Sequence, residues 1–275
     1  MRCYLNPLKV IARKKNPGQE ALPRTTTEQP WDSCDKEKAG WVSPTYTQSR
    51  TLPLNLLVAA ENRCVAVLPN SPDIEAYKLL RTQILQKTEQ EGGRAVMVTS
   101  PLPGEGKTTT VINLAFTFAR EFKQTVLLVD CDFRRQRIHE LLGIKSEKGL
   151  VNHLLNGEPV SDLIIWPGIE KLTLISGGRT IQTSSEVLGS PRMKALVQDM
   201  KTRYPDRYIF FDAPAILTCA DALALAPQVD HILMVVLAGA TPLSEVKSAL
   251  QLLPPEKVLG LVLNNCKTNN KKGRT

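Results

Sequence analysis

Recognisable metal-binding patterns are scarce in this sequence of 275 residues. Its six cysteines form no C-x-x-C pair and its three histidines are scattered, so neither residue type offers a ligand set for a structural metal. Cys131 and Cys219 lie beside apolar runs, where we expect reduced and buried thiols.

Long hydrophobic runs are absent as well. No apolar stretch approaches the roughly 18–20 residues that a membrane-spanning helix needs, and the first residues lack the hydrophobic core of a secretory signal. The sequence therefore predicts a soluble, cytoplasmic protein.

The formal net charge of +8 is concentrated at the two ends. Residues 1–70 and 267–275 carry the excess of lysine and arginine, whereas residues 71–266 are balanced. Basic ends are either solvated or in contact with anionic lipid or nucleic acid. Solvated ends are the favoured interpretation, and we expect no nucleic-acid partner.

The chain divides into three parts. Residues 1–70 predict a largely irregular arm, which is flexible over about the first 50 residues, rich in proline, threonine, lysine and glutamine, and has short packed segments around 51–69. Residues 71–266 predict one folded domain, and residues 267–275 are a basic tail.

Apolar runs alternate with helix-like runs along the central part. The strand-like runs cover 94–99, 125–129, 172–175, 208–211, 231–236 and 258–263, and the helix-like runs fall near 74–86, 107–122, 149–155, 191–203, 220–226 and 244–253. Near-continuous apolar strands are expected where both faces of a sheet are covered. The alternation predicts an α/β domain, doubly wound around a mostly parallel sheet.

A glycine turn separates the first strand-like run from the helix-like run that begins at residue 107. It belongs to the stretch Pro103-Gly-Glu-Gly-Lys-Thr-Thr109. A strand, a glycine turn and Gly-Lys-Thr at the start of a helix are typical of a P-loop, which surrounds phosphates with backbone N–H groups. A chance Gly-Lys-Thr-Thr in a loop is the alternative. The candidate nucleotide-binding residues are Gly104, Glu105, Gly106, Lys107, Thr108 and Thr109.

Polar residues follow three other strand-like runs. Asp130 and Asp132 come after the run that ends at residue 129, Asp212 after the run that ends at 211, and Asn264 ends the last run. In open parallel sheets, ligands bind at the carboxyl ends of the strands. One aspartate there fits a helix cap equally well, but three beside a P-loop favour a functional site. Asn264 would either hydrogen-bond an adenine edge or begin a turn.

The motifs together resemble those of the bacterial tyrosine kinases (BY-kinases) of capsule and exopolysaccharide synthesis, relatives of the MinD/ParA ATPases. The resemblance covers residues 71–265 and is closest to the exosortase-linked, kinase-like branch. The segments that show the resemblance are Glu75-Ala-Tyr-Lys-Leu-Leu-Arg81-Thr, the P-loop, Leu127-Leu-Val-Asp-Cys-Asp-Phe-Arg-Arg135, Phe210-Phe-Asp-Ala-Pro214 and Gly260-Leu-Val-Leu-Asn264. Partitioning MinD/ParA proteins have a lysine where this chain has Leu102, which favours the kinase branch.

The resemblance implies a P-loop protein-tyrosine kinase that uses ATP and Mg²⁺. Asp130 would accept the proton of the tyrosine hydroxyl, and Lys107 would stabilise the transferring phosphoryl group. Thr108, Asp132 and Asp212 would organise Mg²⁺, in keeping with a reaction that needs mainly positioning and charge neutralisation.

The resemblance also implies assembly into a homo-oligomer through the segment that contains Glu75, Lys78 and Arg81. Lys78 stands where the family usually has arginine, so the charge is kept but the planar fork is lost.

One feature departs from the family. Its autokinases end in a tyrosine cluster, but this chain has tyrosines only at positions 4, 46, 77, 204 and 208. We expect Tyr77, Tyr204 and Tyr208 to pack in the domain, and Tyr4 and Tyr46 to lie in the arm.

Two functions stay open. The first is a kinase that regulates polysaccharide synthesis or export, recruited to the inner face of the membrane by a co-polymerase or activator. The alternative is a MinD/ParA-like ATPase switch that acts with a membrane export partner and phosphorylates no tyrosine. A DNA-binding partition ATPase is disfavoured by Leu102 and by the neutral central part.

Overall fold

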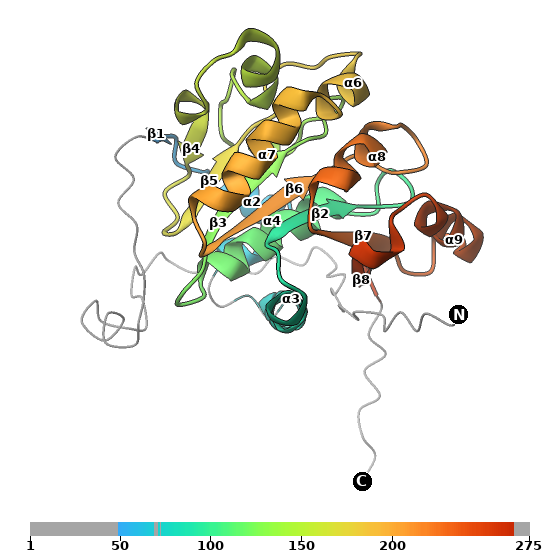
Figure 1. The fold of residues 1–275 in the computed structure, drawn as a ribbon. Coiled ribbons are helices and arrows are strands. Elements are labelled where there is room, and N and C mark those ends of the chain that lie inside the picture. Colours follow the sequence, from blue (N-terminus) through green and yellow to red (C-terminus); the bar gives the residue numbers. More distant parts are fainter. Residues whose placement is uncertain (1–48, 69–70, 72, 267–275) are drawn as a thin grey trace.

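The computed structural model describes residues 49–68, 71 and 73–266. They form an eight-stranded sheet with helices on both faces (Figure 1). The tail 267–275 and the first 48 residues of the predicted arm lie outside the described residues.

The sheet is mostly parallel, as predicted. Its strands are β1 (Arg50–Thr51), β2 (Ala95–Thr99), β3 (Thr125–Asp130), β4 (Ile164–Trp166), β5 (Leu172–Ile175), β6 (Arg207–Asp212), β7 (His231–Leu237) and β8 (Val258–Asn264). They are ordered β1-β4-β5-β3-β6-β2-β7-β8, and β4–β5 is the antiparallel pair.

Helices connect most of the strands. They are α2 (Leu56–Glu61), α3 (Ile74–Glu91), α4 (Lys107–Ala119), α5 (Ile138–Leu141), α6 (Ser184–Leu188), α7 (Pro191–Arg203), α8 (Asp221–Leu225) and α9 (Leu243–Gln251). Shorter helical turns are η1 (Val65–Val67), η2 (Asn152–Asn156), η3 (Val160–Asp162), η4 (Ala226–Gln228) and η5 (Pro255–Lys257). None of the helices in the described part is long and apolar enough to cross a membrane.

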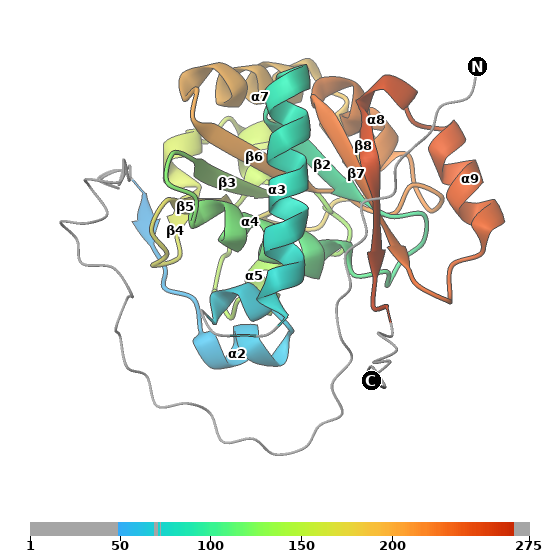
Figure 2. The same ribbon diagram turned by 90° about the horizontal axis from the view of Figure 1, so that it is seen from below.

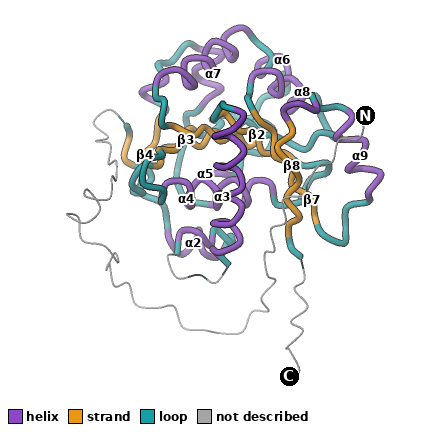
Figure 3. Tube along the Cα trace, turned by 60° about the horizontal axis from the view of Figure 1, so that its bottom comes forward, coloured by secondary structure: helices purple, strands orange, loops and turns teal. Residues whose placement is uncertain are grey.

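The helices cover both faces of the sheet, so each face has its own apolar core. One core packs α2, α3 and α4 against the strands, and the other packs α6, α7, α8 and α9. Figures 2 and 3 show α3 and α4 on one side of the sheet and α7 on the other. The doubly wound α/β fold predicted from the alternating runs is confirmed.

Three aromatic rings join α4 to β6 in the first core. The ring centroid of Phe118 lies 4.7 Å from that of Tyr208 and 4.9 Å from that of Phe210. Thr88 of α3 shares a 2.7 Å hydrogen bond with the buried Tyr208 hydroxyl. These tilted and edge-to-face contacts therefore fix the helix that follows the P-loop against the strand that ends in Asp212.

The folded domain begins earlier than the predicted boundary at residue 71. Strand β1 pairs with β4, and Ala59, Cys64, Ala66 and Val67 are buried in the same core as α3 and α4. The boundary was wrong because this stretch contains only a two-residue strand and a six-residue helix, which are too short to give a periodic signal.

Two further expectations need correction. Helix α3 continues to Glu91, beyond the predicted end at 86, and Gly92 follows it with a φ of 76°. Tyr77 and Tyr208 are buried as expected, but Tyr204 is 44% exposed. It ends α7 at the amino edge of the sheet, where the guanidinium of Arg207 lies 4.0 Å from its ring centroid.

The early start of the domain can be tested by truncation. A chain that begins at residue 49 keeps every described contact, whereas one that begins at residue 71 loses β1, α2 and their buried side chains. We expect the longer form to unfold like the full chain in urea. The shorter form should lose at least about 3 kcal/mol of unfolding free energy, since each buried aliphatic side chain contributes about 1.5–3 kcal/mol. Equal stability of the two truncations would contradict the assignment.

Candidate functional site

The predicted site residues meet at the carboxyl edge of the sheet. The P-loop links β2 to α4, and β2 lies between β6 and β7. Asp130 ends β3 and Asp212 ends β6, and these two residues are direct partners in the parallel ladder. The register of the sheet therefore places the aspartates beside the P-loop.

Two glycines shape the P-loop. Gly104 has a φ of 82° and Gly106 a φ of 88°, both in the left-handed region that favours glycine. A Cβ atom on Gly106 would come within 2.2 Å of the Asn264 amide nitrogen, whereas one on Gly104 would meet no atom within 4 Å. Gly106 is thus required for conformation and for the close approach of β8.

Glu105 holds the P-loop to its neighbours. Its buried carboxylate accepts hydrogen bonds from the Leu102 backbone N–H (3.0 Å) and from the Thr241 hydroxyl. Its backbone carbonyl accepts one from the Asn264 amide (2.8 Å). Asn264 also accepts one from the Asn265 N–H (2.9 Å), so its amide is occupied within the protein and its predicted contact with adenine stays a prediction.

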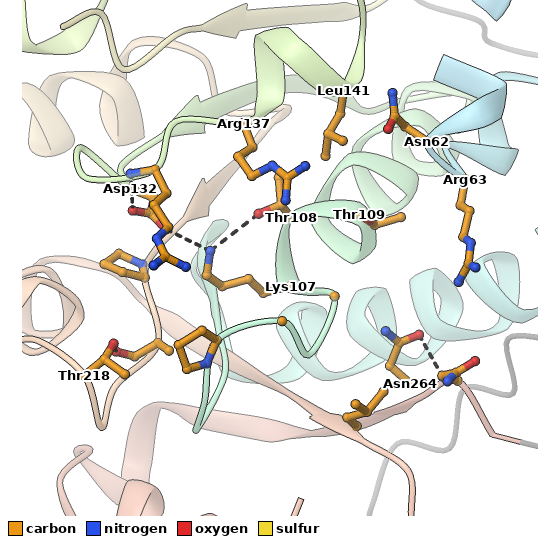
Figure 4. Close-up of a pocket in the computed structure, with 18 of the residues that line it drawn as sticks. Asn62, Arg63, Lys107, Thr108, Thr109, Asp132, Arg137, Leu141, Thr218 and Asn264 are labelled. Atoms are coloured by element: carbon orange, nitrogen blue, oxygen red, sulfur yellow. Dashed lines mark hydrogen bonds and ion pairs between the residues drawn. The ribbon is translucent and has the colours of Figure 1, made fainter. Parts of the chain in front are cut away.

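Lys107 and Thr108 project from the first turn of α4 toward the carboxylates. Lys107 Nζ lies 2.9 Å from Asp132 Oδ2 and 3.9 Å from Asp212 Oδ1. The Thr108 hydroxyl donates to Asp212 Oδ2 at 2.7 Å. Figure 4 shows Lys107 between Asp132 and Thr108. Asp212 Oδ1 is buried and accepts no hydrogen bond from the described residues.

Asp130 lies behind this cluster. It is fully buried and is not among the residues that line the cavity beside the P-loop. Its carboxylate oxygens accept the backbone N–H groups of Asp132 (3.1 Å), Arg137 (3.2 Å) and Ile138 (3.2 Å). The predicted base is therefore covered by segment 131–138, and Asp132 is the one of the three predicted aspartates that lines the cavity.

The burial of several carboxyl groups close together shifts the pKa values of the site residues. Burial and the charge of Asp212 raise the pKa of Asp130 well above its usual value. Burial raises the pKa of Asp212 to about 6, although Lys107 and the Thr108 hydroxyl act in the opposite direction. For Lys107, burial lowers the pKa, but Asp212 and Asp132 outweigh it and the net shift is upward. The single positive charge of Lys107 therefore does not balance the three carboxyl groups of this cluster.

A cavity of about 1170 Å³ opens beside the P-loop. Its basic lining residues are Arg63, Lys107, Arg134, Arg135 and Arg137, and its acidic ones are Glu61, Asp73 and Asp132. Arg134 is tied to Asp221 of α8 (3.2 Å) and to the Ser184 hydroxyl (3.1 Å). Thr109, Asn264 and Asn265 complete the polar part of the lining.

Segment 61–65 forms a side of the cavity that sequence reasoning missed. Glu61, Asn62, Arg63 and Val65 all line it. Asn113, also missed, is fully buried on α4 and accepts a hydrogen bond from the Ala66 N–H (2.8 Å). No motif marks these positions, since they meet only through the packing of α2 and η1 on α4.

The expected assembly residues do not share one exposed surface. Glu75 is exposed and Lys78 is half-buried, and the two form an ion pair of 2.7 Å. Arg81 is turned inward, 2.6 Å from Glu121, and donates to the Thr117 carbonyl at 2.9 Å. Arg81 therefore joins α3 to the end of α4, and the role of the three residues in assembly stays a prediction.

Comparison with known proteins agrees with this geometry. The family model described as CobQ/CobB/MinD/ParA nucleotide binding domain matches residues 96–275. The tyrosine-protein kinase YwqD of Bacillus subtilis is 32% identical over 201 residues, which cover 72% of this chain and 84% of YwqD. The kinase domain of the Escherichia coli tyrosine kinase ETK aligns with a TM-score of 0.70 and 25% identity, covering 89% of this chain and 98% of that domain.

A longer relative is ExoP, the succinoglycan biosynthesis transport protein of Rhizobium meliloti. It is 32% identical over 230 residues, which cover 80% of this chain but only 28% of ExoP. The chain thus matches a minor part of that protein and most of YwqD.

The fold, the P-loop and the strand-end aspartates define a nucleotide-binding protein of the CobQ/CobB/MinD/ParA family. Within that family the chain belongs to the bacterial tyrosine-protein kinases.

The raised pKa of Asp212 predicts a pH dependence of stability. Because the folded-state pKa of about 6 exceeds the ordinary aspartate pKa of about 3.9, the folded protein holds this proton more tightly than the unfolded chain. Stability from this group is present at low pH and is lost as the pH rises toward and through 6. In EDTA, the wild type should therefore gain about 1 kcal/mol of unfolding free energy at pH 5 relative to pH 7.

Urea unfolding of Asp212→Asn isolates the effect. This variant should lose that pH dependence and be more stable than the wild type at pH 7, since the amide carries no charge. The exposed Asp162→Asn is the matched control and should behave like the wild type. An unchanged pH dependence in Asp212→Asn would show that the buried charge is compensated in another way.

Proposed function

We propose that this chain binds ATP with Mg²⁺ in the cavity and transfers the γ-phosphoryl group to tyrosine. The observation that carries the proposal is the meeting of the P-loop, Lys107 and Asp132 at one edge of the cavity, with the buried Asp212 3.9 Å from Lys107 Nζ. Membership in the tyrosine-protein kinases supports tyrosine as the acceptor.

The residues present fit a magnesium ion. Thr108, Asp132 and Asp212 offer hard oxygen ligands, and the buried Asp212 Oδ1 lacks a hydrogen-bond donor among the described residues. These three residues would hold Mg²⁺, which in nucleotide sites uses one or two carboxylates together with phosphate oxygens. Bound there, the ion would neutralise charge on the β- and γ-phosphates.

The chain's own groups then have separate roles. Backbone N–H groups of the P-loop and the start of α4 hold the phosphates. Lys107 leaves Asp132 to pair with phosphate oxygens and stabilises the transferring group. Asp130 takes the tyrosine proton as the general base. This role requires segment 131–138 to uncover its carboxylate.

We also propose that the protein acts in exopolysaccharide synthesis or export, recruited to the inner face of the membrane by a co-polymerase or activator. The similarity to ExoP, a succinoglycan biosynthesis transport protein, supports this setting. Assembly into a homo-oligomer belongs to the same proposal.

Phosphotransfer can be measured directly. Purified protein incubated with Mg·ATP, alone and with a tyrosine-containing glutamate copolymer, should form phosphotyrosine that an antibody detects. Lys107→Met should reduce the rate by several orders of magnitude, since it removes the cation at the transferring group, while the exposed Lys123→Met should keep it. ADP release without phosphotyrosine on the chain or the copolymer would support the ATPase-switch alternative.

The acceptor on the chain itself is also constrained. Tyr77 and Tyr208 are 5% and 1% exposed. Mass spectrometry should therefore find any self-phosphorylation on Tyr4, Tyr46 or Tyr204.

The exposed part of α3 gives a test of assembly. If Glu75 and Lys78 contact a second subunit, the charge reversals Glu75→Lys and Lys78→Glu made separately should each lower the oligomer mass measured by light scattering. Neither should change thermal stability much, because an exposed pair contributes only about 0.3–0.5 kcal/mol. Arg81→Glu, in contrast, should destabilise the monomer by breaking its contact with Glu121. A mass that stays constant in both charge reversals would contradict the assembly role.

A further inference from the structure

The cavity has two ends of different chemistry. Lys107 and Asp132 lie at the P-loop end, whereas Asn62, Arg63 and Asn264 are spread along the side of the cavity opposite Asp132 (Figure 4). The P-loop end has the backbone amides and the cation that phosphates need. The second end is lined by residues that no phosphate-binding motif accounts for.

Arg63 occupies an unusual backbone conformation at this second end. Its φ of 61° lies in the left-handed region, which non-glycine residues seldom adopt. The residue turns the chain from α2 into η1, and its N–H donates to the Ala60 carbonyl at 3.0 Å. Such a conformation persists where the surroundings impose it, and it is found often at ligand sites.

The surroundings that impose it come from the P-loop helix. The Asn113 amide donates to the Arg63 carbonyl (3.0 Å) and to the Thr109 carbonyl (2.8 Å). Its oxygen accepts the Ala66 N–H at 2.8 Å. One buried side chain therefore fixes Arg63 relative to the first turn of α4, and with it relative to any phosphate bound there.

The guanidinium of Arg63 is left without an ion pair or a side-chain hydrogen bond to the residues that the structure describes. The cavity residues nearest to it in the chain are Glu61, Asn62 and Val65. Because Glu61 balances the charge of Arg63, this segment offers no excess of positive charge for a phosphate, whereas its polar and apolar groups suit a purine ring. A planar cation stacks well on the face of such a ring.

We propose that Arg63 positions the base of the bound nucleotide by stacking its guanidinium on the ring, while the P-loop holds the phosphates. The inference rests on the proposed binding of ATP in this cavity. Arg63 lies outside residues 96–275, which the nucleotide-binding family model matches. The base subsite would thus come from a segment that precedes the matched domain.

Calorimetric titration of the full chain with Mg·ATP and with Mg·tripolyphosphate distinguishes the contribution of the base contact to affinity from that of the phosphate contacts. Arg63→Gly removes the side chain and keeps the left-handed turn, because glycine adopts it freely. Arg63→Lys keeps the charge and removes the planar group. Both variants should raise the Kd for ATP about tenfold and leave the Kd for tripolyphosphate within twofold of the wild-type value.

Control variants distinguish this inference from the proposed function. The exposed Arg50→Ala, in β1 and away from the cavity, should bind both ligands like the wild type. Lys107→Met should weaken both ligands, and its failure to do so would overturn the proposed function and this inference with it. An unchanged ATP affinity in Arg63→Gly would overturn the stacking contact alone. So would wild-type affinity in Arg63→Lys, or an equal loss for tripolyphosphate.

Discussion

The site depends on the ion pairs of Lys107 with Asp132 and Asp212. Strands β3 and β6 are neighbours in register, so Asp130 stands opposite Asp212 and the buried carboxylates cannot avoid one another. Lys107 is the lysine that pairs with this cluster in the described part of the chain. Without bound ligand, the arrangement keeps negative charge in a poorly solvated place. A bound cation would offset this negative charge. The site can therefore be locally unfavourable for stability while it is empty and still be retained for its function.

The nucleotide cavity is assembled from segments that are far apart in the sequence. Glu105 ties the P-loop to Thr241 after β7 and to Asn264 at the end of β8. Asn113 ties the opposite side to residues 63–66. The P-loop helix is therefore held on both flanks, and the cavity keeps its shape through side chains that need not touch a ligand.

Local sequence patterns were enough to predict the central strands, the P-loop and the strand-end aspartates, because each has its own periodicity or spacing. They were not enough for β1 and β4, which span two and three residues. Arg81 faces inward because it forms an ion pair with Glu121. Arg63 lines the cavity because Asn113 donates a hydrogen bond to its backbone carbonyl. Such positions depend on partners tens of residues away, which no local pattern records.

The hydrogen bond from Asn264 to the Glu105 carbonyl joins residues 159 positions apart. During synthesis, the P-loop leaves the ribosome long before β8 exists, and domains fold as their last elements emerge. The contact between the P-loop and β8 can consequently form only after residue 264 has been made. A nascent chain that stops short of residue 264 would carry the complete glycine motif and yet have no properly formed place for a nucleotide.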